Sequence, residues 1–97
     1  SDTFAKGAVY INSGARQALL AEKASSLLMV GVTKVEGFFK KGDIIRIFDE
    51  EGNNIGLGKS QYDSKKAEQS LGQKIGKPLI HYHYLVVKED IKNGVQV

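Results

Sequence analysis

The sequence has 97 residues, enough for one domain with a modest core, and its net charge of +3 permits nucleic-acid binding without requiring it. It contains no cysteine and only two histidines, which excludes a disulfide framework or a thiolate metal site and argues against structural zinc. No apolar run approaches the roughly 20 residues of a membrane-spanning helix. Residues 1–6 lack the apolar core of a signal peptide, so we expect a cytoplasmic protein, and the serine start indicates a fragment of a longer chain.

The first predicted elements are a strand and a helix. The side chains of residues 7–11 alternate in the pattern of a short strand. Asn12 and Ser13 are good N-cap residues, and the alanine-rich stretch after them predicts a short helix that runs to Lys23. The apolar run 27–30 is too short for a helix and predicts a buried connector or strand.

The middle of the chain predicts two strands that flank a bend. The strands are expected over residues 32–35 and 43–48, and Gly37 and Gly42 mark the bend between them, as at a corner of a small β-barrel. Residues 50–54 combine glycine with asparagine and predict a hairpin turn.

The last third predicts a return strand, a second helix and a closing strand. The return strand is expected over residues 55–62, and Asp63 caps a short helix over 65–71. The closing strand is expected over 79–87, and the polar end after it is expected to fray. Strands therefore dominate, and we expect one mainly β domain over residues 1–97 with two short helices.

Some side chains can be placed from the pattern. Residues 49–51 predict an exposed acidic tip. Since neighbours on a strand cannot both point inward, one of Phe38 and Phe39 is expected to be exposed, as a contact for another domain or subunit. The residues expected in the core are Leu27, Leu28, Ile45 and Ile47.

Candidate chemistry is sparse. In a strand, His81 and His83 would share one face and Tyr82 and Tyr84 the other, but no third metal ligand lies nearby. A closing strand is therefore favoured over a metal site, and base stacking by the tyrosines stays open. The glycines of residues 52–58 belong to a hairpin and not to a phosphate loop, so no catalytic site is expected.

Positive charge is concentrated late in the chain. A strip of lysines around Tyr62 either follows a phosphate backbone or is an ordinary solvated surface, and both interpretations stay open. The strip consists of Lys59, Lys65, Lys66, Lys74 and Lys77.

Short motifs in a characteristic order carry a family resemblance. They are residues 11–15 (Ile-Asn-Ser-Gly-Ala), 25–28 (Ser-Ser-Leu-Leu), 35–39 (Val-Glu-Gly-Phe-Phe), 42–47 (Gly-Asp-Ile-Ile-Arg-Ile) and 82–84 (Tyr-His-Tyr). Through them the chain resembles the PUA domain family, and most narrowly the C-terminal PUA domains of the glutamate 5-kinases. The resemblance covers about residues 6–90.

The resemblance implies a PUA-like small pseudo-barrel of five to six strands with two short helices, a core over about residues 6–90 and a frayed tail over 91–97. PUA domains are best known as RNA-binding modules. In glutamate 5-kinases the domain is appended to a catalytic domain that phosphorylates glutamate in proline biosynthesis. ATP and magnesium belong to that domain, so no catalytic residue, cofactor or metal is expected in this chain.

Two functions follow as expectations. The first is a non-catalytic RNA-binding module, whose expected contact residues are Gly14, Ala15, Arg16, Lys23, Lys59, Tyr62 and Lys65. The alternative is a regulatory or oligomerisation domain that modulates an attached amino-acid kinase without binding RNA. The expected partners are structured RNA, the kinase domain of a parent chain and further copies of that chain, but no membrane.

Overall fold

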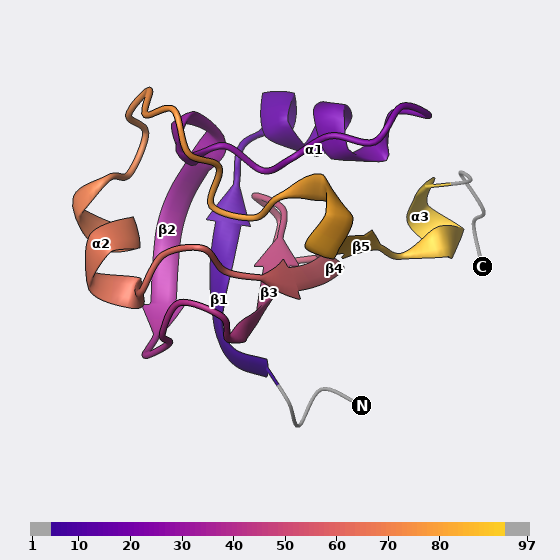
Figure 1. Ribbon diagram of the computed structural model, residues 1–97. Helices are drawn as coiled ribbons and strands as arrows, with labels where there is room; N and C mark the ends of the chain where they lie inside the picture. Colours follow the sequence, from indigo (N-terminus) through magenta and orange to yellow (C-terminus); the bar gives the residue numbers. More distant parts are fainter. Residues whose placement is uncertain (1–4, 93–97) are drawn as a thin grey trace.

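The computed structural model, which describes residues 5–92, is a mixed five-stranded sheet with three short helices (Figure 1). The elements are β1 (Ala5–Ile11), α1 (Ser13–Leu20), β2 (Val32–Gly37), β3 (Ile44–Phe48), β4 (Asn54–Lys59), α2 (Ser64–Gln69), β5 (Leu85–Val87) and α3 (Glu89–Lys92). The strand order is β2-β1-β3-β4-β5; β1 and β3 are parallel and the other pairs antiparallel. The mainly β class predicted from the sequence is confirmed.

The core lies on one face of the sheet. Val9 pairs with Val35 on one side and with Ile47 on the other, so these three side chains point to the same face. Val9 and Ile47 are fully buried, as are Ile45 and Ile11. The helices and the connections between the strands cover this face, so that α1 lies across one end of the sheet and α2 lies beside β2 (Figure 1).

Both predicted N-caps are present, but both helices are shorter than predicted. The Asn12 side chain accepts a hydrogen bond from the Ala15 amide at 2.9 Å, and Asp63 accepts one from the Lys66 amide at 2.8 Å. The first helix ends at Leu20 and not at Lys23, because the backbone is already extended at Ala21. The local capping signal therefore predicted where each helix begins better than where it ends.

Left-handed glycines form the predicted corner between β2 and β3. Gly37 has a φ of 79° and Gly42 a φ of 98°, a region that other residues rarely adopt. Between them, the Lys40 amide donates to the Asp43 carboxylate at 2.8 Å, which closes the turn. The bend is thus fixed by backbone conformation and one side-chain acceptor.

The segment from Leu27 to Gly31 lies between α1 and the closing part of the chain. Leu27 forms a single bridge with Ile80 and is buried, as expected for core residues. Leu28 was expected in the core, but 46% of its surface is exposed, because the segment is extended there and successive side chains alternate. Met29 points back into the core.

The closing strand is shorter than predicted. Residues 82–84 form a 3₁₀ turn, and only Leu85–Val87 pair with β4. The His81 imidazole accepts a hydrogen bond from the His83 amide at 3.1 Å, which caps the turn. The prediction that the histidines share one strand face and the tyrosines the other is therefore wrong.

The polar end of the chain also differs from the expectation. Residues 89–92 form α3, and Ile91 packs against the core, although a frayed tail was expected over 91–97. Residues 93–97, with the rest of that expectation, lie outside the described residues, as do residues 1–4. Over residues 5–92, no helix is long and apolar enough to cross a membrane.

The fit of β4 against the closing segment yields a stability prediction. A Cβ on Gly58 would lie 2.6 Å from Ile80 Cγ2 and 2.7 Å from the Tyr84 carbonyl oxygen, so Gly58→Ala must shift backbone. We expect a loss of about 1–3 kcal/mol in the free energy of unfolding, measured by urea titration. Gly76→Ala is the matched control, because no atom lies within 4 Å of its Cβ position. Equal stability of the two variants would contradict this packing.

Candidate nucleic-acid interface

A groove runs between α1 and the segment that precedes β2; we call it the α1 groove. Its volume is about 320 Å³. Its lining residues are Asn12, Gly14, Ala15, Ala18, Ser26, Leu27, Leu28, Val30 and Gly31. The groove is mostly apolar, with small residues on the helix side.

Close packing at the base of the groove sets its shape. A Cβ on Gly31 would lie 2.5 Å from the Ala15 Cβ, so only glycine allows the helix to approach this closely. The Asn12 amide also donates to the Gly31 carbonyl at 2.9 Å. On the opposite wall, Leu28 and Val30 are 46% and 41% exposed. The groove is therefore a built feature of the fold with an accessible apolar wall.

The residues predicted to contact RNA do not gather in one place. Gly14 and Ala15 line the α1 groove. Arg16 is next to them in sequence, but its Nε donates to the Asp49 carboxylate at 3.2 Å on another side of the helix. Lys23 is exposed beyond the end of α1. Only two of these four residues thus form the groove.

Asp49 explains why Arg16 is turned away. It was expected at an exposed acidic tip, but it is 3% exposed and accepts the Glu51 and Asn53 amides at 3.0 and 2.9 Å. Burial alone would raise the pKa of Asp49, but the hydrogen bonds from Asn53, Glu51 and Arg16 hold its pKa below the usual 3.8. Arg16 therefore faces a hollow with acidic residues, which disfavours a phosphate there.

The later group of predicted contact residues is also dispersed. Tyr62 is 6% exposed, and its hydroxyl donates to the Lys77 carbonyl at 2.6 Å, so its ring cannot present a face to a base. Burial raises the pKa of Tyr62 above its ordinary value. The Lys59 ammonium lies 4.5 Å from the centre of the Tyr84 ring, a cation–π contact. Lys65 is exposed on α2.

The sequence reasoning missed the residues that form the exposed apolar wall of the groove, Leu28 and Val30. Leu28 was assigned to the core, and Val30 was not considered as a contact residue, because four consecutive apolar residues do not show which ones point inward. No simple periodicity marks them, because the chain is extended at Leu28 and then forms a 3₁₀ helix over Met29–Gly31.

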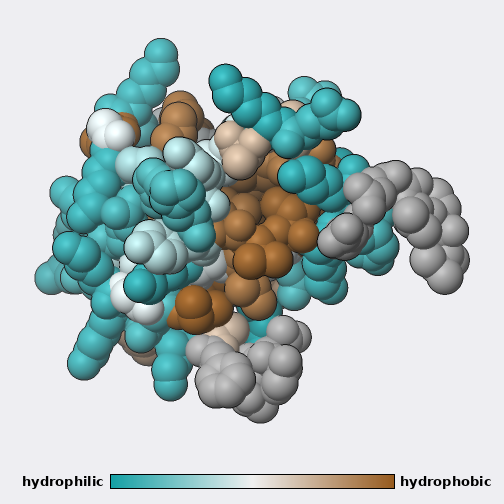
Figure 2. All heavy atoms as spheres, turned by 45° about the vertical axis from the view of Figure 1, so that its right-hand side comes forward, coloured by the Kyte–Doolittle hydropathy of each residue, from teal (hydrophilic) through white to brown (hydrophobic). Residues whose placement is uncertain are grey.

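A second apolar surface lies on the side of the molecule that carries β5 (Figure 2). It includes a hollow of about 410 Å³ between α1 and β5, and Val86 in its lining is 62% exposed. At the bend between β2 and β3, Phe38 is 92% exposed and Phe39 is 3% exposed. The expectation that one of the two phenylalanines is exposed is confirmed.

Residues 5–92 offer no metal centre: they contain no group of three or more histidine, cysteine, aspartate or glutamate side chains that could hold an ion. The His81 and His83 rings do lie close together, with centroids 4.8 Å apart. Two imidazoles without a further ligand fall short of the four ligands of a structural zinc site.

Several known proteins are similar to this chain in sequence. The family model for the PUA domain matches residues 7–81. A glutamate 5-kinase from Bacteroides thetaiotaomicron is 47% identical over 88 residues, which make up 91% of this chain and 24% of that protein. The chain therefore spans about a quarter of the length of the curated relatives it matches.

Solved structures agree. A PUA domain protein from Aeropyrum pernix K1, in complex with tartrate, aligns with a TM-score of 0.70 and 28% identity over 81% of this chain and 43% of that chain. A chain of an H/ACA RNP bound to a substrate RNA that contains 2′-deoxyuridine aligns with a TM-score of 0.67 and 20% identity. That alignment covers 88% of this chain and 25% of the other and shows a shared fold.

The buried Asp49 predicts a pH dependence of stability. Because its pKa is lower in the folded than in the unfolded chain, the ionised form stabilises the fold above about pH 4, and this contribution is lost as the pH falls through the folded-state pKa. At pH 7, Asp49→Asn should lower the free energy of unfolding by about 1–2 kcal/mol. Urea titrations at pH 7 and pH 3 should show the difference from the parent chain shrinking at pH 3.

Glu51→Gln is the control for this experiment, since it removes one negative charge at an exposed neighbour and should change the free energy of unfolding by less than about 0.5 kcal/mol at pH 7. A difference for Asp49→Asn that stays constant between the two pH values would show that the ionised carboxylate does not stabilise the fold.

Proposed function

The chain belongs to the PUA domain family, and we propose that it is a non-catalytic RNA-binding module of a glutamate 5-kinase. The observation that carries RNA binding is the α1 groove: an apolar wall faces small residues across a space of about 320 Å³. Single-stranded RNA is commonly recognised through unstacked bases that enter such apolar sites. The proposal places one or more bases of a single-stranded segment against Leu28 and Val30.

Comparison with other proteins supports the proposal. The RNP in which a similarly folded chain occurs is bound to RNA, although at 20% identity the likeness extends to the fold alone. The parent is proposed from the 47% identity to a glutamate 5-kinase. In that setting, ATP-dependent phosphorylation of glutamate belongs to the remaining three quarters of the protein, and this domain adds a binding surface.

A charge placed in the groove tests the RNA function. Ala18 lines the groove and is exposed on α1, so Ala18→Glu should keep the helix, repel phosphates and place a charge in the apolar groove where a base would enter. We expect the dissociation constant for a labelled RNA hairpin with a single-stranded overhang to rise about tenfold, measured by fluorescence anisotropy, which corresponds to about 1.4 kcal/mol. Gln17→Glu adds the same charge one residue away, outside the groove lining, and should change the constant much less.

Salt provides the internal check of this experiment. Phosphate contacts release counterions, so the affinity should fall as salt rises from about 50 to 200 mM. Absence of binding at low salt, binding that ignores salt, or equal effects of the two charge variants would each reject RNA binding through this groove.

A second function is favoured by the apolar surface beside β5. Val86 is 62% exposed on an edge strand, next to a hollow that Leu19 and Leu85 also line. Exposed apolar edges of this kind mark contacts with other protein surfaces. In this alternative, the domain modulates the kinase or its assembly without binding RNA.

Val86→Lys in the full-length kinase that contains this chain tests the alternative. If this surface docks on the kinase domain or on a second subunit, the buried charge should shift the oligomeric state or the kinase activity, measured by analytical ultracentrifugation and a coupled assay. Leu28→Lys is a control of similar exposure outside the β5 surface. Unchanged assembly and activity in the Val86 variant would remove this alternative.

A further inference from the structure

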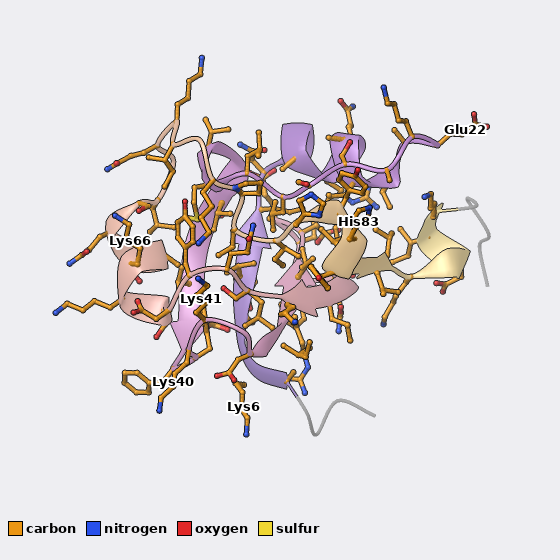
Figure 3. All side chains as sticks on the ribbon, viewed as in Figure 1. Lys6, Glu22, Lys40, Lys41, Lys66 and His83 are labelled. Atoms are coloured by element: carbon orange, nitrogen blue, oxygen red, sulfur yellow. The ribbon has the colours of Figure 1, made fainter. Side chains whose placement is uncertain are left out.

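Lysines from separate segments converge on the side of the molecule that carries α2. Figure 3 shows Lys40, Lys41 and Lys66 on this side and Glu22 at the opposite end of the molecule. Lys41, Lys66 and Lys77 line one hollow of about 500 Å³, which we call the lysine pocket. They are distant in sequence, so the convergence is a product of the fold.

Hydrogen bonds fix the backbone beneath two of these lysines. Next to Lys41, the Gly42 amide donates to the Ser60 carbonyl at 2.7 Å. The carbonyl of Lys77 accepts the Tyr62 hydroxyl at 2.6 Å. The buried tyrosine, which cannot stack on a base, thus holds Lys77 in place. The side chains of Lys41 and Lys77 therefore extend into solvent from backbone positions that hydrogen bonds hold in place.

The third lysine is also anchored at its backbone. The Lys66 amide donates to the Asp63 carboxylate in the first turn of α2. Asp63 is the one acidic residue in the pocket lining, where it faces three lysines, and one of its oxygens is already engaged in this bond. The pocket therefore holds an excess of positive charge.

Lys41 and Lys77 are close enough for the charge of Lys41 to act on Lys77. Partial desolvation, followed by the positive charge of Lys41, lowers the pKa of Lys77 below its ordinary value. The Lys77 ammonium also lies 5.9 Å from the centre of the Tyr62 ring. Two amines that repel each other are a favourable place for an anion, because an anion between them turns repulsion into attraction.

The lysine pocket and the α1 groove both border a third hollow. Ile75 and Gly76 line both the lysine pocket and a neighbouring hollow of about 390 Å³, which also contains Lys74. Leu28 and Val30 line both that hollow and the α1 groove. A track therefore leads from the apolar groove, past Lys74, to the three converging lysines.

We propose that Lys41, Lys66 and Lys77 form a phosphate-binding pocket that anchors a phosphate group, either of an RNA backbone or of a free polyphosphate. With RNA, the inference rests on the function proposed above: a base enters the α1 groove and the strand continues along the track, so that a phosphate reaches the pocket. If the ligand is a free polyphosphate, the inference depends on the lysine pocket alone and not on the proposed RNA function. Ammonium groups bind phosphate oxygens by charge-assisted hydrogen bonds in both cases.

The test measures phosphate and RNA binding separately on the 97-residue chain. Sodium tripolyphosphate is titrated at low salt and followed by amide NMR shifts, and the RNA hairpin is followed by anisotropy. We expect tripolyphosphate to shift amides around Lys41, Lys66 and Lys77 and to raise the pKa of Lys77. Lys41→Gln with Lys77→Gln should weaken tripolyphosphate binding about tenfold or more, while Lys88→Gln, after β5 on the far side of the sheet, should have little effect.

The outcomes separate the pocket from the RNA function. If the double variant loses binding of both tripolyphosphate and the RNA hairpin, the lysine pocket contributes to RNA binding. Binding of tripolyphosphate without RNA keeps the pocket and rejects the RNA function. RNA binding that the double variant leaves unchanged but Ala18→Glu abolishes keeps the RNA function and overturns the pocket. Absence of any tripolyphosphate response, or an equal loss in Lys88→Gln, also overturns the pocket.

Discussion

Backbone hydrogen bonds hold the segment 27–31 in the middle of the molecule, and the core and the surface both depend on it. Its first residue exchanges hydrogen bonds with the strand-like segment at Leu79 and Ile80, at 2.8 and 2.9 Å. Its last carbonyl accepts the Asn12 amide at the start of α1. Because successive side chains alternate, Leu27 and Met29 complete the core while Leu28 and Val30 form a wall of the α1 groove. The fold therefore cannot bury this segment without also building the groove.

Features that depend on local chemistry could be predicted from the sequence. The N-cap residues Asn12 and Asp63 and the glycine corner at Gly37 and Gly42 lie where the pattern places them, since each involves residues close in sequence. The 3₁₀ turn after His81 was missed, because short-range alternation cannot show that this stretch pairs with no neighbouring strand. Strand ends depend on partners that lie far away in the chain.

The candidate site illustrates the same limit. Gly14 and Ala15, which the motif at the start of α1 singled out, line the α1 groove, and Ala15 packs on Gly31 where only a small residue fits. Arg16 was assigned to RNA by analogy with the family's first helix, and Tyr62 from its place among lysines in the sequence. Each has a partner distant in sequence, Asp49 for the arginine and the Lys77 carbonyl for the tyrosine. A charged or aromatic residue is available to a ligand only after the fold has left it without such a partner.

Net charge is a poor guide to where an anion would bind on this domain. A total of +3 spread over 97 residues would produce a weak and uniform attraction. Salt largely screens the interaction between exposed charges that lie farther apart than about one Debye length, roughly 8 Å at physiological salt. The local arrangement of charges therefore decides where an anion is attracted. At the hairpin between β3 and β4, Asp49 compensates the charge of Arg16, whereas the positive charge of Lys41 contributes to lowering the pKa of Lys77. The attraction for an anion is therefore expected to be strongest on the side that carries α2 and weakest at the acidic hairpin.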